Sequence, residues 1–316
     1  MDRRSFLAGA LAMLATGCSS RRNEIVVGSK NFTEQLILGE ILLQYLGQVC
    51  AARTDGRFYM GGTYICQQAI LAGRIDTYVE YTGTAVAAVL KEKFSSNREQ
   101  VYEQMKSGYK QRFSLDVMPS LGFNNSFAMI VRGDDAKRMG ITRLSELSRY
   151  APQMTLGVGY EFLERPDGYN GLVRTYDLKF RGSPAVMDLG LLYNALEHKT
   201  VDIVAGNNTD GLIDALGLVV LDDDRSYFPP YDAVPVVRPE LLQRFPVAQA
   251  AFGHLAGTIS AEEMRQMNYA ADGKHNDVKA IAAAFLKRKG LAASGSMTRN
   301  DPKYDSRSAR LSYRRL

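Results

Sequence analysis

The feature of this sequence that most constrains its fold is the alternation of short apolar segments with helical ones. Ile25–Val27 is a β-branched run that ends at Gly28, and the apolar spacing after it predicts a helix that stops near Gly47. Further short strands are predicted at Phe58–Met60 and Ile75–Val79, with a helix between them. Strands and helices that alternate in this way are typical of a parallel sheet covered by helices.

The start of the first helix carries a capping signal. Asn31 is a suitable N-cap residue, and Glu34 stands three positions later, where it can return a hydrogen bond to the cap. The sequence therefore predicts that Glu34 serves the helix end.

The same layout recurs later in the chain. Strands are predicted at Phe127–Val131, Met154–Val158 and Val201–Ala205, with a helix over Met187–Leu196. The strand before Tyr81 and the strand that ends at Ala205 both lead into polar loops rich in threonine and glycine. Ligands bind outside the carboxyl ends of strands in α/β sheets and at domain interfaces. The repeat predicts two α/β lobes around a ligand cleft.

The division of the chain follows from this layout. Lobe I is expected to comprise 24–125 plus 231–290, and lobe II to comprise 126–230. Adjacent Pro229 and Pro230 stiffen the segment in which the chain returns to lobe I. Residues 291–316 are polar, basic and non-periodic, so we expect a disordered tail.

The N-terminus has the pattern of an export signal, over residues 1–18. Arg3 and Arg4 precede the apolar run Phe6–Ala15, which is too short to span a bilayer. The small residues before Cys18 resemble a lipobox, although Ala15 stands where leucine is usual, and predict lipidation of Cys18. The arginine pair fits a twin-arginine signal or an ordinary Sec signal, and both remain open. We expect an exported protein, in the periplasm or at the cell surface, that is anchored through Cys18.

Composition narrows the possible functions. The chain is 46% hydrophobic and 23% charged, as in ordinary globular proteins. Its formal net charge of +5 is not gathered on a basic face with interleaved aromatics, so nucleic acid is not an expected partner.

Cys50 and Cys66 could pair in an oxidising compartment or remain buried thiols, and the sequence leaves both open.

Six segments of the chain match one family's motifs in order and spacing. They are Gly28–Gln35, Glu80–Ala85, Leu121–Asn125, Phe162–Tyr169, Thr209–Gly211 and Phe228–Tyr231. Together they resemble the substrate-binding proteins of osmoprotectant ABC transporters, the group that takes glycine betaine, carnitine and choline. The resemblance covers about Glu24 to Leu291, and it implies a type II periplasmic-binding-protein fold with two α/β lobes joined by two crossovers.

The resemblance also implies a ligand site. A trimethylammonium group has no proton to donate, but aromatic faces attract it through cation–π contact. Tyr81, Phe127 and Tyr231 fall on three ring positions of the family's aromatic box. The fourth ring position falls on Asn207, which is a departure, because an amide has no π face.

The other end of the ligand needs donors for a carboxylate. Lys30, Thr84 and Arg165 fall on the family's anion-binding positions, and Asn125 on a polar position beside the box. Relatives restricted to choline tend to carry aspartate where Thr84 stands, so Thr84 favours a ligand with a carboxylate.

The sequence thus predicts a monomeric solute-binding protein, without cofactor or metal, that delivers a quaternary ammonium compound such as glycine betaine to an ABC permease. Because Asn207 replaces a ring, a more polar betaine or an amino-acid-like solute is an alternative ligand. An enzyme is not expected, because the usual hydrolase, metalloprotease and P-loop motifs are missing and the three histidines have no metal spacing. A sensor that passes its ligand to a receptor is a further alternative.

Overall fold

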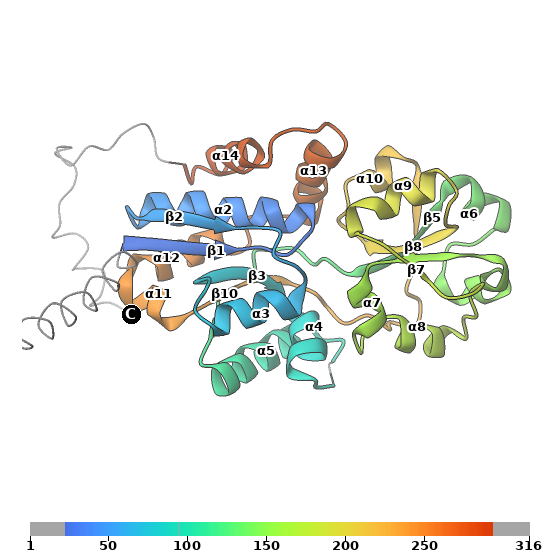
Figure 1. The fold of residues 1–316 in the computed structure, drawn as a ribbon, viewed down its shortest axis with the longest axis horizontal. Helices are drawn as coiled ribbons and strands as arrows, with labels where there is room; N and C mark the ends of the chain where they lie inside the picture. Colours follow the sequence, from blue (N-terminus) through green and yellow to red (C-terminus); the bar gives the residue numbers. More distant parts are fainter. Residues whose placement is uncertain (1–22, 94, 293–316) are drawn as a thin grey trace, which may run out of the picture.

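Two five-stranded sheets, each flanked by helices, form the computed structural model (Figure 1). It describes residues 23–93 and 95–292, so the predicted export signal with Cys18, and residues 293–316 of the predicted tail, lie outside the described residues. We keep the predicted division as a definition: lobe I is 24–125 plus 231–290, and lobe II is 126–230.

The sheet of lobe I has the order β2-β1-β3-β10-β4. Strand β1 pairs in parallel with β2 and β3, whereas β10 lies antiparallel between β3 and β4, so the sheet is mixed and not purely parallel. Its strands are β1 (Glu24–Gly28), β2 (Arg53–Arg57), β3 (Thr77–Tyr81), β4 (Asp116–Val117) and β10 (Ala233–Val237).

The sheet of lobe II repeats this arrangement, with the order β7-β6-β8-β5-β9 and β5 antiparallel to both of its neighbours. In both sheets the fourth strand is the one by which the chain arrives from the other lobe. The strands are β5 (Phe127–Arg132), β6 (Leu156–Val158), β7 (Ala185–Val186), β8 (Ile203–Asn207) and β9 (Leu218–Leu221).

The two crossovers between the lobes run beside each other. Asn124 and Asp232 form an antiparallel bridge, and the Asn125 N–H donates to the Tyr231 carbonyl at 3.0 Å. The lobes are therefore joined by a short, hydrogen-bonded connection of two chain segments.

Helices cover both faces of each sheet (Figure 1). In lobe I they are α2 (Thr33–Val49), α3 (Thr63–Leu71), α4 (Thr82–Thr84) with a π-helical turn Ala85–Leu90, α5 (Arg98–Phe113), α11 (Pro239–Arg244), α12 (Val247–Leu255), α13 (Ala261–Asp272) and α14 (Val278–Arg288). In lobe II they are α6 (Gly133–Met139), α7 (Tyr160–Glu164), α8 (Tyr169–Tyr176), α9 (Leu192–Glu197) and α10 (Leu212–Ala215), with 3-10 turns at Leu144–Arg149, Ala151–Gln153 and Leu189–Leu191.

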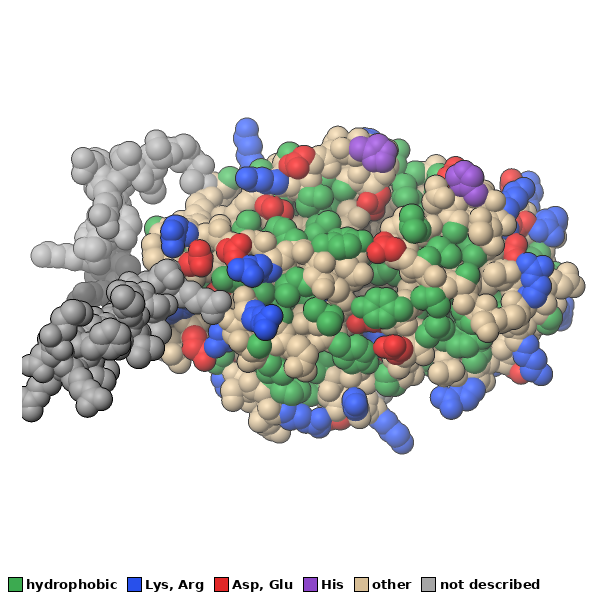
Figure 2. Space-filling view, viewed as in Figure 1, with side chains coloured by type: hydrophobic (Ala, Val, Ile, Leu, Met, Phe, Trp, Pro, Cys, Tyr) green, Lys and Arg blue, Asp and Glu red, His purple; other side chains and the backbone are tan. Residues whose placement is uncertain are grey.

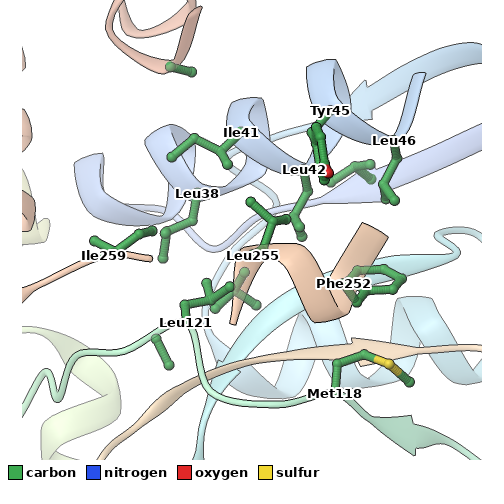
Figure 3. Close-up of a cluster of buried hydrophobic side chains, with 14 of the residues drawn as sticks. Leu38, Ile41, Leu42, Tyr45, Leu46, Met118, Leu121, Phe252, Leu255 and Ile259 are labelled. Atoms are coloured by element: carbon green, nitrogen blue, oxygen red, sulfur yellow. The ribbon is translucent and has the colours of Figure 1, made fainter. Parts of the chain in front are cut away.

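The core of lobe I has two layers because β1 is buried on both sides. Ile25 and Val27 face the cluster around α2, whereas Val26 faces the cluster that holds α3 and α5. Figure 3 shows the α2 layer, in which one stripe of this helix, spaced by three and four residues, meets α12 and the segment before β5. The labelled side chains are Leu38, Ile41, Leu42, Tyr45, Leu46, Met118, Leu121, Phe252, Leu255 and Ile259.

The predicted strand at Phe58–Met60 is wrong, because the strand lies immediately before it, at β2 (Arg53–Arg57). This strand is an edge strand whose residues are mostly half-buried or exposed, so hydrophobicity does not reveal it. The Phe58 ring instead covers Gly39 and Gly56, where an added Cβ would lie 2.8 and 2.9 Å from ring carbons.

The sequence did not predict β10, since Pro235 stands in its middle and proline is rare inside sheets. Pro235 pairs with Val79 and accepts a hydrogen bond from the Met118 N–H at 2.9 Å through its carbonyl. A proline can occupy this place because its carbonyl remains available to the ladder.

The helix predicted over Met187–Leu196 is shorter than expected. The chain first makes the 3-10 turn Leu189–Leu191, whose N-cap Asp188 accepts from the Gly190 N–H at 2.9 Å, and α9 follows from Leu192.

Cys50 and Cys66 do not form the disulfide that the sequence left open; both are free thiols. Cys66 is a residue of α3 and lies in the core layer between that helix and the sheet. Cys50 follows the last residue of α2 and packs on the opposite face of the sheet. The sheet thus separates the two sulfur atoms, and burial raises the pKa of the Cys66 thiol to about 12.

Lysine and arginine side chains lie mainly around the margin of the face drawn in Figure 2, whereas hydrophobic side chains and some acidic ones lie in its middle. Within the described residues, no helix is long and apolar enough to cross a membrane. The same part of the chain has no group of three or more histidine, cysteine, aspartate or glutamate side chains that could hold a metal ion.

Candidate functional site

A cavity of about 290 Å³ lies between the lobes, and all eight residues predicted for the ligand site line it. They come from strand ends, the crossovers and short helices that converge on the cleft. The lining residues are Lys30, Asn31, Phe32, Gly62, Tyr81, Thr84, Asn125, Phe127, Gly159, Tyr160, Glu161, Phe162, Arg165, Val186, Met187, Asp188, Leu189, Ala205, Asn207 and Tyr231.

Two of the three predicted rings, Phe127 and Tyr231, are brought together in an aromatic cluster. Phe127 meets Tyr231 edge to face at 5.8 Å between centroids, and meets Phe162 in the same way at 4.9 Å. Tyr81 stands apart from them and stacks with Phe32 at 6.4 Å. Sequence reasoning missed Phe32 as a lining residue, although it lies in the Gly28–Gln35 motif.

Asn207 takes the place of a ring beside Phe127. The two residues are direct partners in the antiparallel β5–β8 pairing, so their side chains leave the same face of the sheet. The Asn207 N–H donates to Asp210 Oδ2 at 2.9 Å, and the Asn207 side chain makes no hydrogen bond within the described residues. The amide side chain is therefore available to a ligand.

Arg165 of lobe II contacts lobe I, and a neighbouring carboxylate balances its charge. Its guanidinium pairs with Asp167, donates to Thr84 Oγ1 of lobe I at 3.0 Å, and lies 4.6 Å from the centre of the Phe127 ring. Burial acts to lower the pKa of Arg165, but the Asp167 carboxylate raises it above its ordinary value. The Tyr231 hydroxyl also donates to Asp167, at 2.7 Å.

The charge of Lys30 is likewise balanced by a carboxylate. Its ammonium forms an ion pair with Glu80 and lies 4.8 Å from the centre of the Tyr81 ring, and both charged side chains are almost fully buried. An ammonium has three donors, so pairing with Glu80 leaves donors for a second acceptor in the cavity.

Glu161 is a half-buried acidic residue in this cavity, with its Oε1 atom buried, that the sequence did not indicate. It comes from lobe II and lies against the backbone of Gly62 in lobe I, where an added Cβ would stand 2.1 Å from Glu161 Oε1. Burial raises its pKa, while Lys30 and Arg165 act to lower it. Gly62 is the N-cap of α3, so the carboxylate is at the positive end of a helix.

Further hydrogen bonds join the two lobes around the cavity. The Tyr59 hydroxyl of lobe I donates to Asp188 Oδ2 at 3.0 Å, and the Gly62 N–H donates to the Tyr160 hydroxyl at 3.2 Å. With Arg165 and Thr84, these contacts hold the cleft in a closed arrangement.

The prediction that Glu34 completes a capping box is wrong. The N-cap of α2 is Phe32, without a side-chain cap, and Glu34 points into the molecule with 1% of its surface exposed. It accepts hydrogen bonds from both lobes, and burial raises its pKa although those bonds act to lower it.

A second cavity of about 310 Å³ adjoins the first, and the two share Asn31, Phe32, Leu189 and Asn207 in their walls. Its other side carries acidic groups, Asp210 and Asp272. The remaining lining residues are Thr33, Tyr59, Gly190, Leu192, Tyr193, Gly206, Leu212, Ala271 and His275. Burial raises the pKa of Asp210 to about 7, and this carboxylate accepts from the Tyr193 hydroxyl.

Comparison with known families matches residues 23–288 to the substrate-binding domain of an ABC-type glycine betaine transport system. The chain belongs to this family. Its members are extracytoplasmic transport binding proteins and not enzymes, which confirms the family predicted from the motifs. The chain is accordingly the substrate-binding protein of an osmoprotectant ABC importer.

Two relatives of this chain are named for different solutes. The chain is 33% identical to the carnitine transport binding protein OpuCC of Listeria monocytogenes, over 85% of this chain and 88% of the relative. It is also 33% identical to an ergothioneine transport permease/ergothioneine binding protein, EgtU, of Helicobacter pylori, over 90% of this chain but 51% of the relative. The chain thus spans about half of that second protein.

A solved structure supports the fold. A crystal structure described as a glycine betaine/carnitine/choline ABC transporter matches with a TM-score of 0.70 and 30% identity, over 84% of this chain and 99% of the other. Together with the two mixed sheets, this match confirms the predicted type II periplasmic-binding-protein fold.

Proposed function

We propose that the importer's solute is a zwitterionic quaternary ammonium compound of the glycine betaine class, held in the 290 Å³ cavity between the lobes. The observation that carries this proposal is the pairing of both cations of the cavity. Lys30 is paired with Glu80, and Arg165 with Asp167, so neither pair brings a net charge to the ligand. The two cations keep donors for the carboxylate of a solute, and Glu161 and Asp188 in the same wall give its cationic end acidic neighbours.

Each end of such a solute has suitable partners. Tyr81, Phe127 and Tyr231 line the cavity, and the ring surface that Lys30 and Arg165 leave uncovered suits a trimethylammonium group, through cation–π attraction and contact with its methyls. The donors that Lys30 and Arg165 keep after pairing suit a carboxylate. Asn125 supplies a further polar group beside the rings.

Calorimetry of the purified protein tests the proposal, with glycine betaine, carnitine, choline and proline as titrants. We expect glycine betaine or carnitine to bind at least about tenfold more tightly than choline, a difference of about 1.4 kcal/mol. Equal or tighter binding of choline would contradict the zwitterion requirement, and binding of proline alone would contradict the cation site.

Asn207 favours a second candidate, a betaine that carries an additional polar ring. Where the family has a wall of the aromatic box, this chain has an amide on the boundary of a second, acidic cavity. A ligand with hydrogen-bond donors beyond its trimethylammonium group could extend past Asn207 towards Asp210. The relative named for ergothioneine binding supports including that solute in the same titration series.

The delivery step is also part of the proposal. The family implies a permease in the membrane as partner, and the sequence around Cys18 predicts a lipid anchor that keeps the protein near it. Closure of the lobes around the solute would give the permease one loaded shape to recognise.

A further inference from the structure

Glu34 gathers hydrogen bonds from four segments that are far apart in the sequence. Its donors are Tyr81 at the end of β3, Asn125 in the first crossover, Thr209 after β8 and Asn268 on α13. The segments thus include both lobes and one of the crossovers between them.

The geometry divides these donors between the two carboxylate oxygens. Glu34 Oε1 accepts from the Tyr81 hydroxyl at 2.6 Å and from Asn125 Nδ2 at 2.7 Å. Glu34 Oε2 accepts from the Thr209 hydroxyl at 2.6 Å and from Asn268 Nδ2 at 3.2 Å. Every donor faces an acceptor-only group, which an ionised carboxylate provides and an amide does not.

No ion pair explains this carboxylate within the described residues. A buried charge without a counter-ion is costly unless hydrogen bonds replace its water. The four donors supply that replacement, so Glu34 and its partners form one connected unit.

Two of the four donors line the ligand cavity. The hydroxyl bond fixes how the Tyr81 ring is turned, with Phe32 stacked beside it. The orientation of the Asn125 amide is fixed too, because its NH₂ donates to Glu34, and its oxygen accepts no hydrogen bond from Glu34. That oxygen is buried and has no hydrogen-bond partner within the described residues.

The other two donors connect the carboxylate to lobe II. Thr209 belongs to lobe II and stands two residues after Asn207, and its carbonyl accepts from Asn268 Nδ2 at 2.8 Å. The Thr209–Glu34 bond joins lobe II to lobe I, whereas the bonds from Tyr81 and Asn125 lie on the lobe I side.

We propose that Glu34 is a positioning residue that orients Tyr81 and Asn125 for the solute and, through Thr209, couples their orientation to closure of the lobes. The inference rests on the proposed function for the identity of the solute. It names a residue that does not itself line the cavity.

The first test replaces Glu34 by glutamine and measures affinity by calorimetry with the solute that wild type binds best. The glutamine NH₂ must face one pair of donors, so we expect affinity to fall by about tenfold or more. Glu40→Gln is the matched control, since Glu40 is on the same helix and, within the described residues, its side chain hydrogen-bonds to Gln44 and to no other residue. Wild-type affinity in Glu34→Gln would overturn the proposal.

A kinetic variant tests the coupling to closure. Thr209→Val keeps the shape of the side chain but removes the donor from lobe II. We expect the solute to dissociate several-fold faster, with its association rate nearly unchanged, when followed by stopped-flow fluorescence. An unchanged dissociation rate would remove the closure part of the proposal.

A double-mutant cycle separates positioning from a general loss of stability. Tyr81→Phe keeps the ring and removes only the hydroxyl bond to Glu34. If Glu34 acts through Tyr81, this change weakens binding in wild type and adds little in Glu34→Gln. Losses in affinity that simply add would contradict the proposal.

The same cycle run without solute distinguishes failure of the positioning role of Glu34 from failure of the proposed solute class. Because the Tyr81–Glu34 bond lies within lobe I, urea unfolding should also show a coupling between these substitutions. If wild type binds no solute of the series, the proposed function fails, and the unfolding cycle still decides whether Glu34 holds Tyr81. Absence of that coupling would overturn the positioning role.

Discussion

Replacing Asn207 by tyrosine should complete the aromatic cluster and tighten the binding of every trimethylammonium solute. Asn207 is the cross-strand partner of Phe127, so a ring at this position would stand on the cavity face of the sheet beside Phe127. The Asn207 side chain makes no hydrogen bond within the described residues that the change would break. The backbone bond to Asp210 is retained.

The size of the expected gain in affinity follows from the exclusion of water from the site. A cation–π contact that is shielded from water contributes roughly 1–2 kcal/mol. At about 1.4 kcal/mol for each tenfold change in affinity, this corresponds to roughly five- to thirtyfold tighter binding. Glycine betaine and choline present the same cation, so both should gain by a similar factor.

Calorimetry of wild type, Asn207→Tyr and Asn207→Leu with both solutes measures the effect. The leucine variant is the control, because it adds apolar surface at the same position without a π face. We expect the tyrosine variant to bind both solutes more tightly than the leucine variant does.

Two results would refute this reasoning. If Asn207→Tyr and Asn207→Leu bind equally well, apolar contact and not the ring face holds the cation. If Asn207→Tyr abolishes binding of the best solute, Asn207 is a direct polar contact. The solute then extends into the second cavity, as the candidate with an additional polar ring requires.

Three further predictions concern other parts of the molecule. Thr84→Val should weaken glycine betaine several-fold in calorimetry and leave choline nearly unchanged, because the lost hydroxyl serves the carboxylate end. Asp210→Asn should remove a loss of stability with rising pH. Because burial raises the pKa of Asp210 to about 7, its contribution to the stability of the fold is fully present below about pH 4 and is lost as pH rises through 7. The melting temperatures at pH 5 and pH 8 should therefore differ less in the variant than in wild type. Cys18→Ala should release the protein from the membrane fraction, and an intact Gly17–Cys18 peptide in the mature wild-type protein would contradict lipidation.

The fold could be predicted well wherever strands are buried on both faces. Ile25–Val27 reads as a strand because every residue is apolar, which burial between two helical layers requires. The edge strand Arg53–Arg57 and the proline-containing strand Ala233–Val237 escaped prediction. Their pairing depends on partners elsewhere in the chain, and their own residues do not reveal it.

The site shows the same limit more sharply. The residues predicted from motif order, Tyr81 and Arg165 among them, line one cavity, and their roles toward a solute stay predictions. It did not reveal Glu34, because the capping pattern gave a sufficient local explanation for an acidic residue in a first helical turn. Its real partners lie between 47 and 234 residues away, and only the folded chain brings them together.

If the solute is the proposed zwitterion, the pairing of the site's cations explains how the cleft accommodates its carboxylate. Lys30 and Arg165 are 3% and 6% exposed, and an unpaired cation at that depth would be strongly destabilising. Glu80 and Asp167 remove that cost before any solute arrives, so the solute's carboxylate is not needed to neutralise the site. We expect such a carboxylate to be recognised instead by the direction of the donors that remain. Selectivity then depends on donor geometry and ring faces, and both are set by residues such as Glu34 and Asp167 that hold the contacting side chains in place.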